Sequence, residues 1–299
     1  MLVLPCAAVT YLLFRRKTVH DFDERPRPSD RSYEPYWDTI LSNMAYVRSL
    51  PYEEQTLTAE DGVRLCANWY DRGSKRTLIL LHGFCSTPLN NFSALARAFY
   101  ERGYNLLMVW QRGHGKSGGK YTTLGLRESG DLLRWIDRVN ELVPAGSIAV
   151  YGISMGGATV AYASDRIVSS SVKVIGIDCC YCSPYDQMCK GKGVLSVLWT
   201  PMMPLVCLFS KLLMGVNIRR HTYDSLKNTR IPAVFMIGLA DKKVPPRFFR
   251  TNYEACASEK ELIEVPGAPH ALAFVAADGT LRERLFEFVD RSFRAEADR

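Results

Sequence analysis

The sequence has no internal repeat with a period of about 20 to 50 residues, no low-complexity tract, and no excess of proline or glycine. These absences exclude solenoids, propellers and collagen-like arrays. The 47% of hydrophobic residues and 23% of charged residues exclude disorder as the dominant state. A chain of 299 residues with this composition is long enough to bury one sizeable core.

Disulfide frameworks and nucleotide-binding loops are missing as well. Nine cysteines are an odd number in a chain too large to need disulfides, and the cluster at residues 179–189 lacks the paired Cys-x-x-Cys spacing of a structural zinc site. We therefore expect reduced, buried thiols and no metal. Residues 112–119 contain Gly-Lys-Ser without P-loop spacing, and no G-x-G-x-x-G fingerprint is present. Residues 112–119 are interpreted as a turn.

Positive charge is concentrated in two segments. The net charge is +7; residues 183–230 carry seven Lys or Arg against two Asp or Glu, and residues 1–31 carry six against four. Because no zinc-finger spacing or RNA-binding aromatic box accompanies this charge, nucleic acid is not an expected partner. An anionic membrane surface or anionic ligand fits better, and a solvated basic face is the alternative.

Residues 2–14 form an almost uninterrupted apolar run that ends at Arg15-Arg16-Lys17. As a helix this run reaches only about 20 Å, against a hydrocarbon core of about 30 Å, and it lacks the features of a signal peptide. We interpret it as an interfacial anchor or the end of a membrane segment. The three cations would then leave the bulk of the protein on the cytoplasmic side. The alternative is a frayed or self-packed terminus of a cytoplasmic protein.

Short apolar runs alternate with amphipathic stretches along the rest of the chain. A hairpin is expected around Asp61-Gly62, because Asp-Gly supplies the positive φ angles of a tight turn. The alternation predicts a doubly wound, mostly parallel α/β sheet led by this antiparallel hairpin. The hairpin strands are expected at 55–59 and 63–70, the later strands at 77–81, 105–110, 147–151, 172–177, 233–237 and 261–265, and the helices at 88–102, 124–142, 156–169, 246–258 and 280–296.

Residues 183–230 interrupt this alternation with a long apolar run that contains Pro201 and Pro204. A membrane span here would place the two halves of the site described below on opposite sides of a membrane, so we expect a helical cap instead. The predicted domains are therefore an N-terminal anchor and arm at 1–31, a core of 32–182 and 231–299, and a cap at 183–230.

Ser154 stands in Gly152-Ile-Ser-Met-Gly156, after a predicted strand and before a predicted helix. This is the context of a nucleophile elbow. The turn is so tight that side chains two positions before and after the serine would clash, and the serine is exposed in a strained backbone conformation. The alternative is a glycine-rich helix start with a capping serine.

A serine nucleophile needs an imidazole base, and the imidazole needs a carboxylate. His270 is the histidine that follows the last predicted strand, and the order nucleophile, acid, histidine places the acid between them. Asp241, at the end of the 233–237 strand, is the preferred acid, with Asp178 as the alternative.

Two backbone amides are expected to bind the oxyanion of the tetrahedral intermediate. One belongs to Met155, directly after the serine, and the other to Phe84 in the loop after the 77–81 strand. His82 is expected to hold this loop by hydrogen bonds rather than act as a base. Glu128 and Asp131, three apart on one helix, predict a solvated or ion-paired surface rather than a second acid pair.

Together these residues resemble the α/β-hydrolase superfamily over roughly residues 55–296. Within it, residues 111–117, the serine motif and Asp178-Cys179 resemble bacterial single-pass membrane-anchored hydrolases grouped with serine aminopeptidases and monoacylglycerol-lipase-like esterases. The resemblance implies an N-terminal anchor, a cap over an acyl pocket and no cofactor. Two departures, Trp110 in place of a common Asp and Cys179-Cys180-Tyr181 in place of Cys-Pro-aromatic, lie outside the proposed triad.

We therefore expect a serine hydrolase, a carboxylesterase that acylates Ser154 with His270 as base and Asp241 as orienting acid. Its partner would be a small-molecule or lipid-like acyl ester. The alternatives are a lipase or thioesterase, an aminopeptidase-like amidase, which the shortage of carboxylates in the cap disfavours, and a non-catalytic binding protein on this fold. An apolar acyl site is expected from the cap residues Trp199, Met202, Met203, Leu205, Phe209 and Met214.

Overall fold

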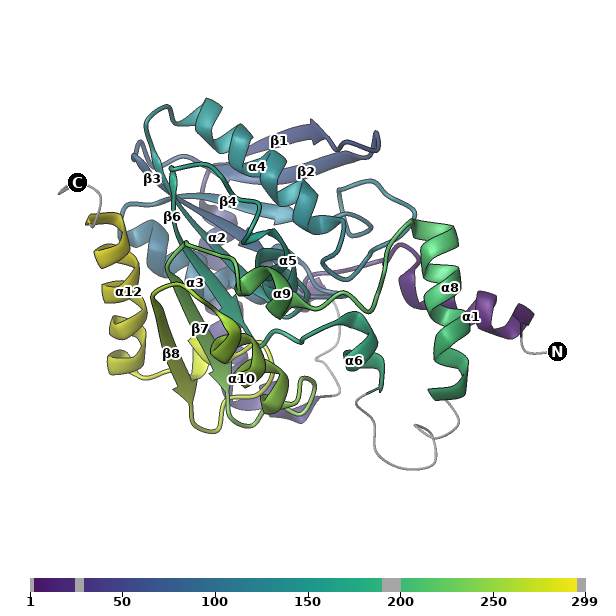
Figure 1. Cartoon of the computed structure of the whole chain (residues 1–299). Coiled ribbons are helices and arrows are strands. Elements are labelled where there is room, and N and C mark those ends of the chain that lie inside the picture. The colour runs from purple at the N-terminus through teal and green to yellow at the C-terminus, as the bar shows by residue number, and fades with distance from the viewer. Residues whose placement is uncertain (1–2, 25–29, 190–199, 295–299) are drawn as a thin grey trace.

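The computed structural model describes residues 3–24, 30–189 and 200–294. Eight strands form one sheet in the order β1-β2-β4-β3-β5-β6-β7-β8, with helices on both faces (Figure 1). β1 pairs with β2 and β2 with β4 in antiparallel fashion, and all later pairs are parallel. The expected doubly wound α/β fold is confirmed. The strands are Glu53–Thr58, Arg64–Tyr70, Arg76–Leu81, Asn105–Trp110, Ser147–Ile153, Val172–Asp178, Ala233–Gly238 and Lys260–Val265.

The sheet divides the core into two layers because successive strand residues point to opposite faces. Ile79 and Leu81 pack with α4, α5 and α10 on one face, whereas Leu78 and Leu80 pack with α2, α3 and α12 on the other. The helices are α1 Val3–Phe14, α2 Trp37–Ser49, α3 Pro88–Glu101, α4 Glu128–Leu142, α5 Met155–Ala163, α6 Pro184–Cys189, α8 Met203–Met214, α9 Thr222–Leu226, α10 Pro246–Ala255, α11 Ala273–Ala276 and α12 Gly279–Arg294.

The β1–β2 hairpin closes where the sequence predicts. Gly62 has a φ of +80°, and the Ala59 amide donates to the Val63 carbonyl at 2.8 Å. The expected start of α4 at residue 124 is wrong, because Leu124 and Gly125 have φ angles of +54° and +94° and cannot belong to a right-handed helix. The helix begins at Glu128 instead.

An additional helix, α2, lies between the N-terminal arm and the hairpin. Its buried residues Trp37, Ile40, Met44 and Val47 recur at helical spacing. Three of them cluster with Tyr33 and Leu272, and the helix packs beside α3. This packing attaches the N-terminal region to the body of the protein.

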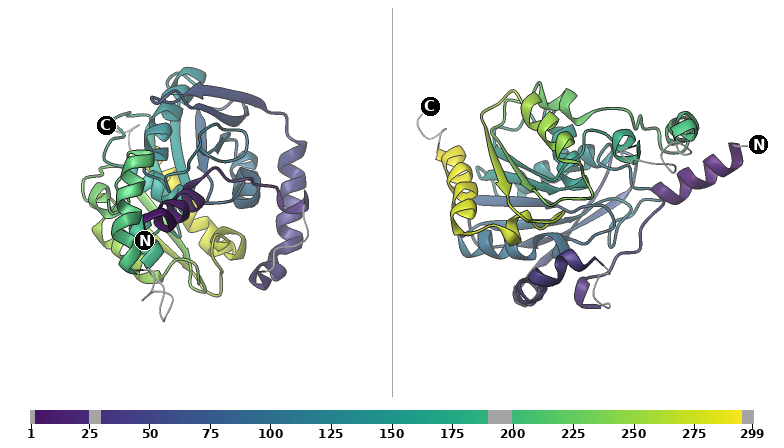
Figure 2. Two further views of the ribbon diagram at one scale, coloured as in Figure 1. Left: turned by 90° about the vertical axis from the view of Figure 1, so that its right-hand side faces the viewer. Right: turned by 90° about the horizontal axis from the view of Figure 1, so that it is seen from below.

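Residues of the predicted cap form α6, α8 and α9, and α8 packs against α1 at one end of the molecule, away from the sheet (Figures 1 and 2). Phe14 of α1 is fully buried in a cluster that includes Met203 and Met214. No helix in the described ranges is long and apolar enough to cross a membrane. The division into arm, core and cap remains a prediction.

Candidate active site

Ser154 lies in the turn between β5 and α5 with φ +56° and ψ −111°, a conformation that L-residues rarely adopt. The flanking glycines have the steric role expected of them. A Cβ atom on Gly152 would lie 2.2 Å from the carbonyl oxygen of Gly156, and one on Gly156 would lie 1.7 Å from that of Leu81. The turn therefore requires glycine at both positions.

The structure brings Ser154, His270 and Asp241 together from three separate loops. His270 Nδ1 lies 2.7 Å from Asp241 Oδ2, and His270 Nε2 lies 3.1 Å from Ser154 Oγ. Because a carboxylate only accepts, Nδ1 carries the proton of the neutral ring and Nε2 accepts from the serine hydroxyl. Asp241 Oδ1 accepts the Lys243 and Val244 amides at 2.7 and 2.9 Å. These bonds orient a carboxylate whose side chain is fully buried.

Asp178, the alternative acid, is occupied elsewhere. Its backbone carbonyl accepts the Ser154 amide at 2.8 Å, and its Oδ2 accepts the Tyr151 hydroxyl at 3.3 Å. Its Oδ1 has no hydrogen-bond partner in the described part of the chain, and burial raises the pKa of the carboxyl to about 7. The structure therefore places Asp241, and not Asp178, against His270.

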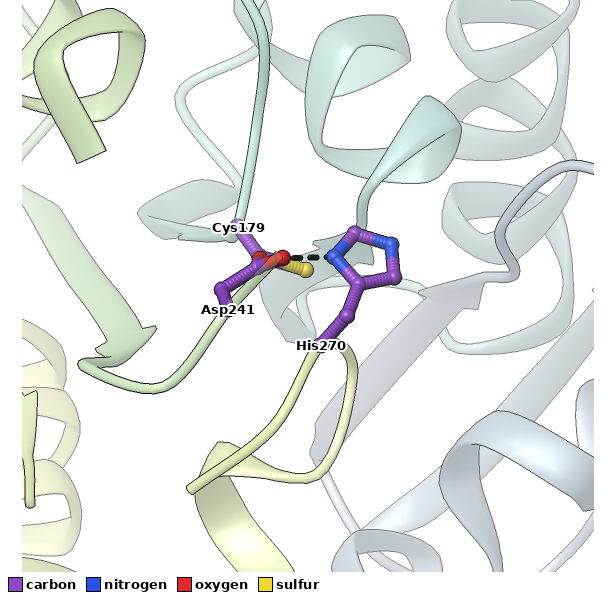
Figure 3. Close-up of side chains that lie close together, drawn as sticks. All are labelled: Cys179, Asp241 and His270. Carbon is purple, nitrogen blue, oxygen red and sulfur yellow. Dashed lines mark hydrogen bonds and ion pairs between the residues drawn. The ribbon is translucent and has the colours of Figure 1, made fainter. Parts of the chain in front are cut away.

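Cys179 lies beside the same pair, with its sulfur near the Asp241 carboxylate (Figure 3). The ligand atoms of Cys179, Asp241 and His270 all fall within 4.8 Å of one another, so these side chains could hold a metal ion. Burial raises the pKa of the Cys179 thiol well above its ordinary value, however, which disfavours the thiolate that a metal needs.

The loop after β3 passes directly over Ser154. A Cβ on Gly83 would lie 3.4 Å from the Ser154 Cβ, and the Gly83 amide donates to Asn91 Oδ1 at 2.7 Å. Within the ranges described, the amides of Phe84 and Met155 have no acceptor. Both predicted oxyanion donors are therefore available to an incoming oxygen.

Two buried histidines hold this loop. His82 Nε2 accepts the Gln111 amide at 3.1 Å, and His114 Nε2 accepts the Cys85 amide at 3.2 Å. Each Nδ1 faces a backbone carbonyl, that of Gly83 at 2.7 Å and that of Arg112 at 3.0 Å respectively. Burial lowers the pKa of His82 to about 3 and also lowers that of His114, so both rings are neutral. The expected role of His82 is confirmed, whereas sequence reasoning missed that of His114.

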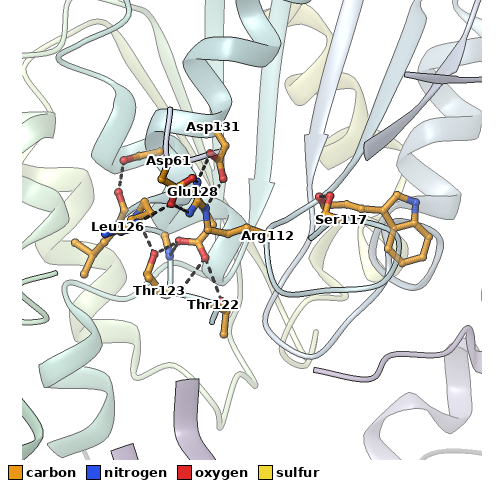
Figure 4. Close-up of polar contacts among 12 residues, drawn as sticks. Asp61, Arg112, Ser117, Thr122, Thr123, Leu126, Glu128 and Asp131 are labelled. Carbon is orange, nitrogen blue, oxygen red and sulfur yellow. Dashed lines mark hydrogen bonds and ion pairs between the residues drawn. The ribbon is translucent and has the colours of Figure 1, made fainter. Parts of the chain in front are cut away.

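An ion-pair network fixes the turn at residues 112–119 (Figure 4). Arg112 donates to Asp131 at 2.6 Å and to Asp61 at 2.7 Å. Glu128 corrects the expectation of a solvated or ion-paired surface. It is buried, and its two oxygens accept bonds from Thr122, Thr123 and the Gly125 amide. Both acids stabilise loops beside the site.

A cavity of about 170 Å³ opens on Ser154 and His270. The structure does not bring the predicted cap residues to it. Met203 and Met214 are buried against Phe14, and Trp199 lies outside the described residues. Their role in acyl binding, with that of Met202, Leu205 and Phe209, remains a prediction. The lining is Phe22, Asp30, Tyr33, Gly83, Phe84, Cys85, Ser86, Asn91, Ile153, Ser154, Lys243, His270 and Ala271.

The strand order and the glycine-flanked turn are those of the α/β-hydrolase fold. Residues 76–188 match the family model described as alpha/beta hydrolase fold. Together with the structural neighbours, this match supports the α/β-hydrolase superfamily for this chain.

Similar proteins come from distant organisms. YqkD of Bacillus subtilis (strain 168) is 26% identical over 217 residues, covering 72% of this chain and 71% of YqkD. The membrane protein YNL320W of Saccharomyces cerevisiae is 25% identical over 235 residues, 75% of each chain. The structure of the Pyrococcus furiosus esterase Pf2001 matches with a TM-score of 0.63 and 26% identity, covering 82% of this chain and 93% of that one. The fold and this neighbour support a hydrolase.

Proposed function

We propose that the protein is a serine carboxylesterase. The observation that carries the proposal is the hydrogen-bonded series from Ser154 through His270 to Asp241, beside two backbone amides, of Phe84 in the loop above and of Met155 in the elbow, that have no acceptor among the described residues. Such a series lets an ordinary hydroxyl act as a nucleophile near neutral pH.

In the acylation step, Ser154 Oγ attacks the ester carbonyl carbon while His270 Nε2 takes the hydroxyl proton. The amides of Phe84 and Met155 bind the negative oxygen of the tetrahedral intermediate. The bond to the alcohol oxygen then breaks, and His270 returns the proton to the departing alcohol. A water molecule, deprotonated by His270, attacks the acyl-enzyme and releases the carboxylic acid and free Ser154.

The cavity favours an ester over the amine-bearing substrate of an aminopeptidase. Recognition of a substrate ammonium group calls for an unpaired carboxylate, because charged groups are bound by opposite charges. Apart from the triad, the acidic side chain at the cavity is Asp30. Its Oδ2 atom lies 3.7 Å from Lys243 Nζ, so this carboxylate is already paired. Lipase, thioesterase and amidase activities on the same residues are the competing assignments.

The test is hydrolysis of p-nitrophenyl esters from acetate to decanoate, with Ser154→Ala as the control. A fluorophosphonate label located by mass spectrometry identifies the nucleophile. We expect turnover by the wild type, loss of turnover in the variant, and label on Ser154. A wild-type protein that neither hydrolyses any ester nor takes the label would favour a non-catalytic binding protein on this fold.

We also propose that the surface formed by α1 and α8 contacts an anionic membrane. Five of the nine large hydrophobic side chains exposed in the described part of the chain lie on these two helices: Tyr11, Leu12, Leu208, Leu212 and Leu213. Arg15 and Arg16 follow α1 directly and are exposed, as is Lys211 on α8, and residues 1–20 contain no acid. An apolar face bordered by cations suits the boundary of an anionic bilayer. The yeast relative YNL320W is described as a membrane protein, which is in keeping with this proposal.

A further inference from the structure

The N-terminal arm and the residues directly after it, rather than the predicted cap, supply one wall of the cavity at Ser154. Phe22 of the 3-10 helix η1 (Phe22–Glu24), Asp30, and Tyr33 of η2 (Arg31–Tyr36) all line it. None of the described residues of α6, α8 or α9 does so. The arm therefore contributes directly to the space in which a substrate of Ser154 must fit.

Phe22 is fixed in place by bonds to the start of α3. Its amide donates to Asn90 Oδ1 at 2.8 Å, and the Asn90 side-chain amide donates to the His20 carbonyl at 2.9 Å. The carboxylate of the preceding Asp21 accepts the Thr87 hydroxyl at 2.5 Å and pairs with Arg48 at 2.8 Å. These contacts of Phe22 and of the two residues before it make its ring a defined wall.

Tyr33 ties the same wall to the loop that carries His270. Its buried hydroxyl donates to the His270 carbonyl at 3.2 Å, and its ring meets that of Phe22 edge to face at 5.9 Å between centroids. Behind it, Trp37 of α2 belongs to the same buried cluster as Leu272. Two aromatic rings, one backed by the protein core, thus face the cavity.

The size of the cavity limits what it can hold. At about 170 Å³ it is well below the about 300 to 1,000 Å³ of pockets for drug-sized ligands. If each non-hydrogen atom needs about the 30 Å³ of a water molecule in the liquid, the cavity holds about five or six such atoms. This volume matches a short acyl group, and a fatty acyl chain would extend out of the cavity.

We propose that Phe22 and Tyr33 are specificity-determining residues that restrict the acyl group to about four carbons. This inference rests on the proposed esterase function and adds its substrate class, an ester of a short-chain carboxylic acid. The alcohol portion leaves toward the adjoining groove of about 490 Å³, which shares Asp30, Lys243 and His270 with the cavity.

The experiment compares kcat/KM for p-nitrophenyl acetate, butyrate and octanoate in the wild type and two variants of Phe22. The wild type should prefer acetate and butyrate. Phe22→Ala should raise the octanoate-to-butyrate ratio at least tenfold, since each newly buried methylene is worth about fourfold in kcat/KM. Phe22→Trp should lower kcat/KM for butyrate relative to that for acetate, because the larger ring narrows the cavity. Opposite shifts from two variants cannot both arise from poor folding.

Three further variants sharpen the result. Phe248→Ala removes a phenylalanine of similar burial outside the cavity and should leave the ratios unchanged. Tyr33→Phe keeps the ring and should keep the chain-length profile. Met202→Ala tests the cap directly. If this variant raised the octanoate-to-butyrate ratio tenfold while Phe22→Ala left the ratio unchanged, the acyl site would belong to the cap and the inference would be overturned.

The fluorophosphonate label separates this inference from the function on which it rests. If Ser154 is labelled and short esters are hydrolysed, but the Phe22 variants keep the wild-type ratios, the arm does not select the acyl chain. A wild type that prefers octanoate overturns the inference in the same way. If Ser154 is not labelled and no ester is hydrolysed, the proposed function itself fails.

Discussion

Each residue proposed for catalysis is held by neighbours that do not take part in the reaction. Asp241 is oriented by two backbone amides, His270 by the Tyr33 hydroxyl on its carbonyl, and Ser154 by the glycines of its turn. The strained φ of Ser154 persists because the surrounding packing fixes it. This division between reacting and positioning groups makes single substitutions informative.

Asp241→Asn should lower kcat for p-nitrophenyl butyrate by roughly 10⁴-fold while leaving the fold intact. The amide has the size of the carboxylate but loses the charge that stabilises the imidazolium, and it can impose the wrong tautomer on His270. Steady-state kinetics and circular dichroism measure both effects. Asp178→Asn is the matched control, expected to change kcat less than tenfold, and equal losses in the two variants would contradict the assignment of the acid.

Asp178 should instead affect how stability depends on pH. Burial raises its pKa from the ordinary 3.8 to about 7. Between about pH 4 and pH 7, the folded protein therefore keeps a proton on Asp178 that the unfolded chain has already released. The stabilisation is complete below pH 4 and is lost as pH rises to 7, by up to about 4 kcal/mol. Asp178→Asn should remove this dependence. Urea unfolding at pH 5 and pH 8 should show the variant gaining on the wild type at pH 8, and parallel curves would refute the effect.

At the scale of elements, the loops after β3 and β4 form one unit beside the elbow. His82 and His114 bond them to each other, and Arg112 bonds the second loop to α4 and to the hairpin turn at Asp61. The proposed oxyanion amide of Phe84 therefore depends on side chains from both loops, from α4 and from the hairpin turn.

Arg112→Met should destabilise the protein by about 3 to 5 kcal/mol, because it leaves the Asp131 carboxylate buried without its partner. Arg127→Met removes another cation bonded to Asp61, but its side chain is 41% exposed against 6% for Arg112. Its loss should cost less than about 1 kcal/mol. Urea denaturation of the two variants measures the difference, and similar losses would show that the buried network is not the stabilising feature.

The local elements could be predicted because their patterns are local. The strands from β3 to β7 coincide with apolar runs, the hairpin follows from Asp61-Gly62, and the elbow follows from glycine spacing. The role of the arm and of the residues directly after it in lining the cavity could not be predicted, because it depends on contacts such as that of Tyr33 with His270, 237 residues apart in sequence. The missed α2 had a signal in the spacing of Trp37, Ile40, Met44 and Val47. The expectation that the cap covers the acyl site came from a resemblance, and no spacing in the sequence tests it.

At the scale of the whole molecule, one N-terminal segment contributes to two proposed functional surfaces. α1 packs on α8, residues Arg15 and Lys17 bridge to Tyr121 and His114, and the chain then continues to Phe22 in the proposed acyl cavity. The same 30 residues therefore join the proposed membrane surface to the proposed substrate site.

Full-length protein should sediment with vesicles that contain phosphatidylserine and should bind less to pure phosphatidylcholine, with the difference shrinking as salt rises, since exposed charges are screened. Leu12→Gln combined with Leu212→Gln should weaken binding to both vesicles at least tenfold, because each removes apolar area from the α1–α8 surface. Val168→Gln is the matched control, since Val168 is 95% exposed and lies outside that surface.

Sedimentation velocity without lipid tests whether a second copy of the chain occupies the α1–α8 surface instead. A dimer that the double variant disrupts, with no vesicle binding by the wild type, would assign the surface to a second copy of the chain instead.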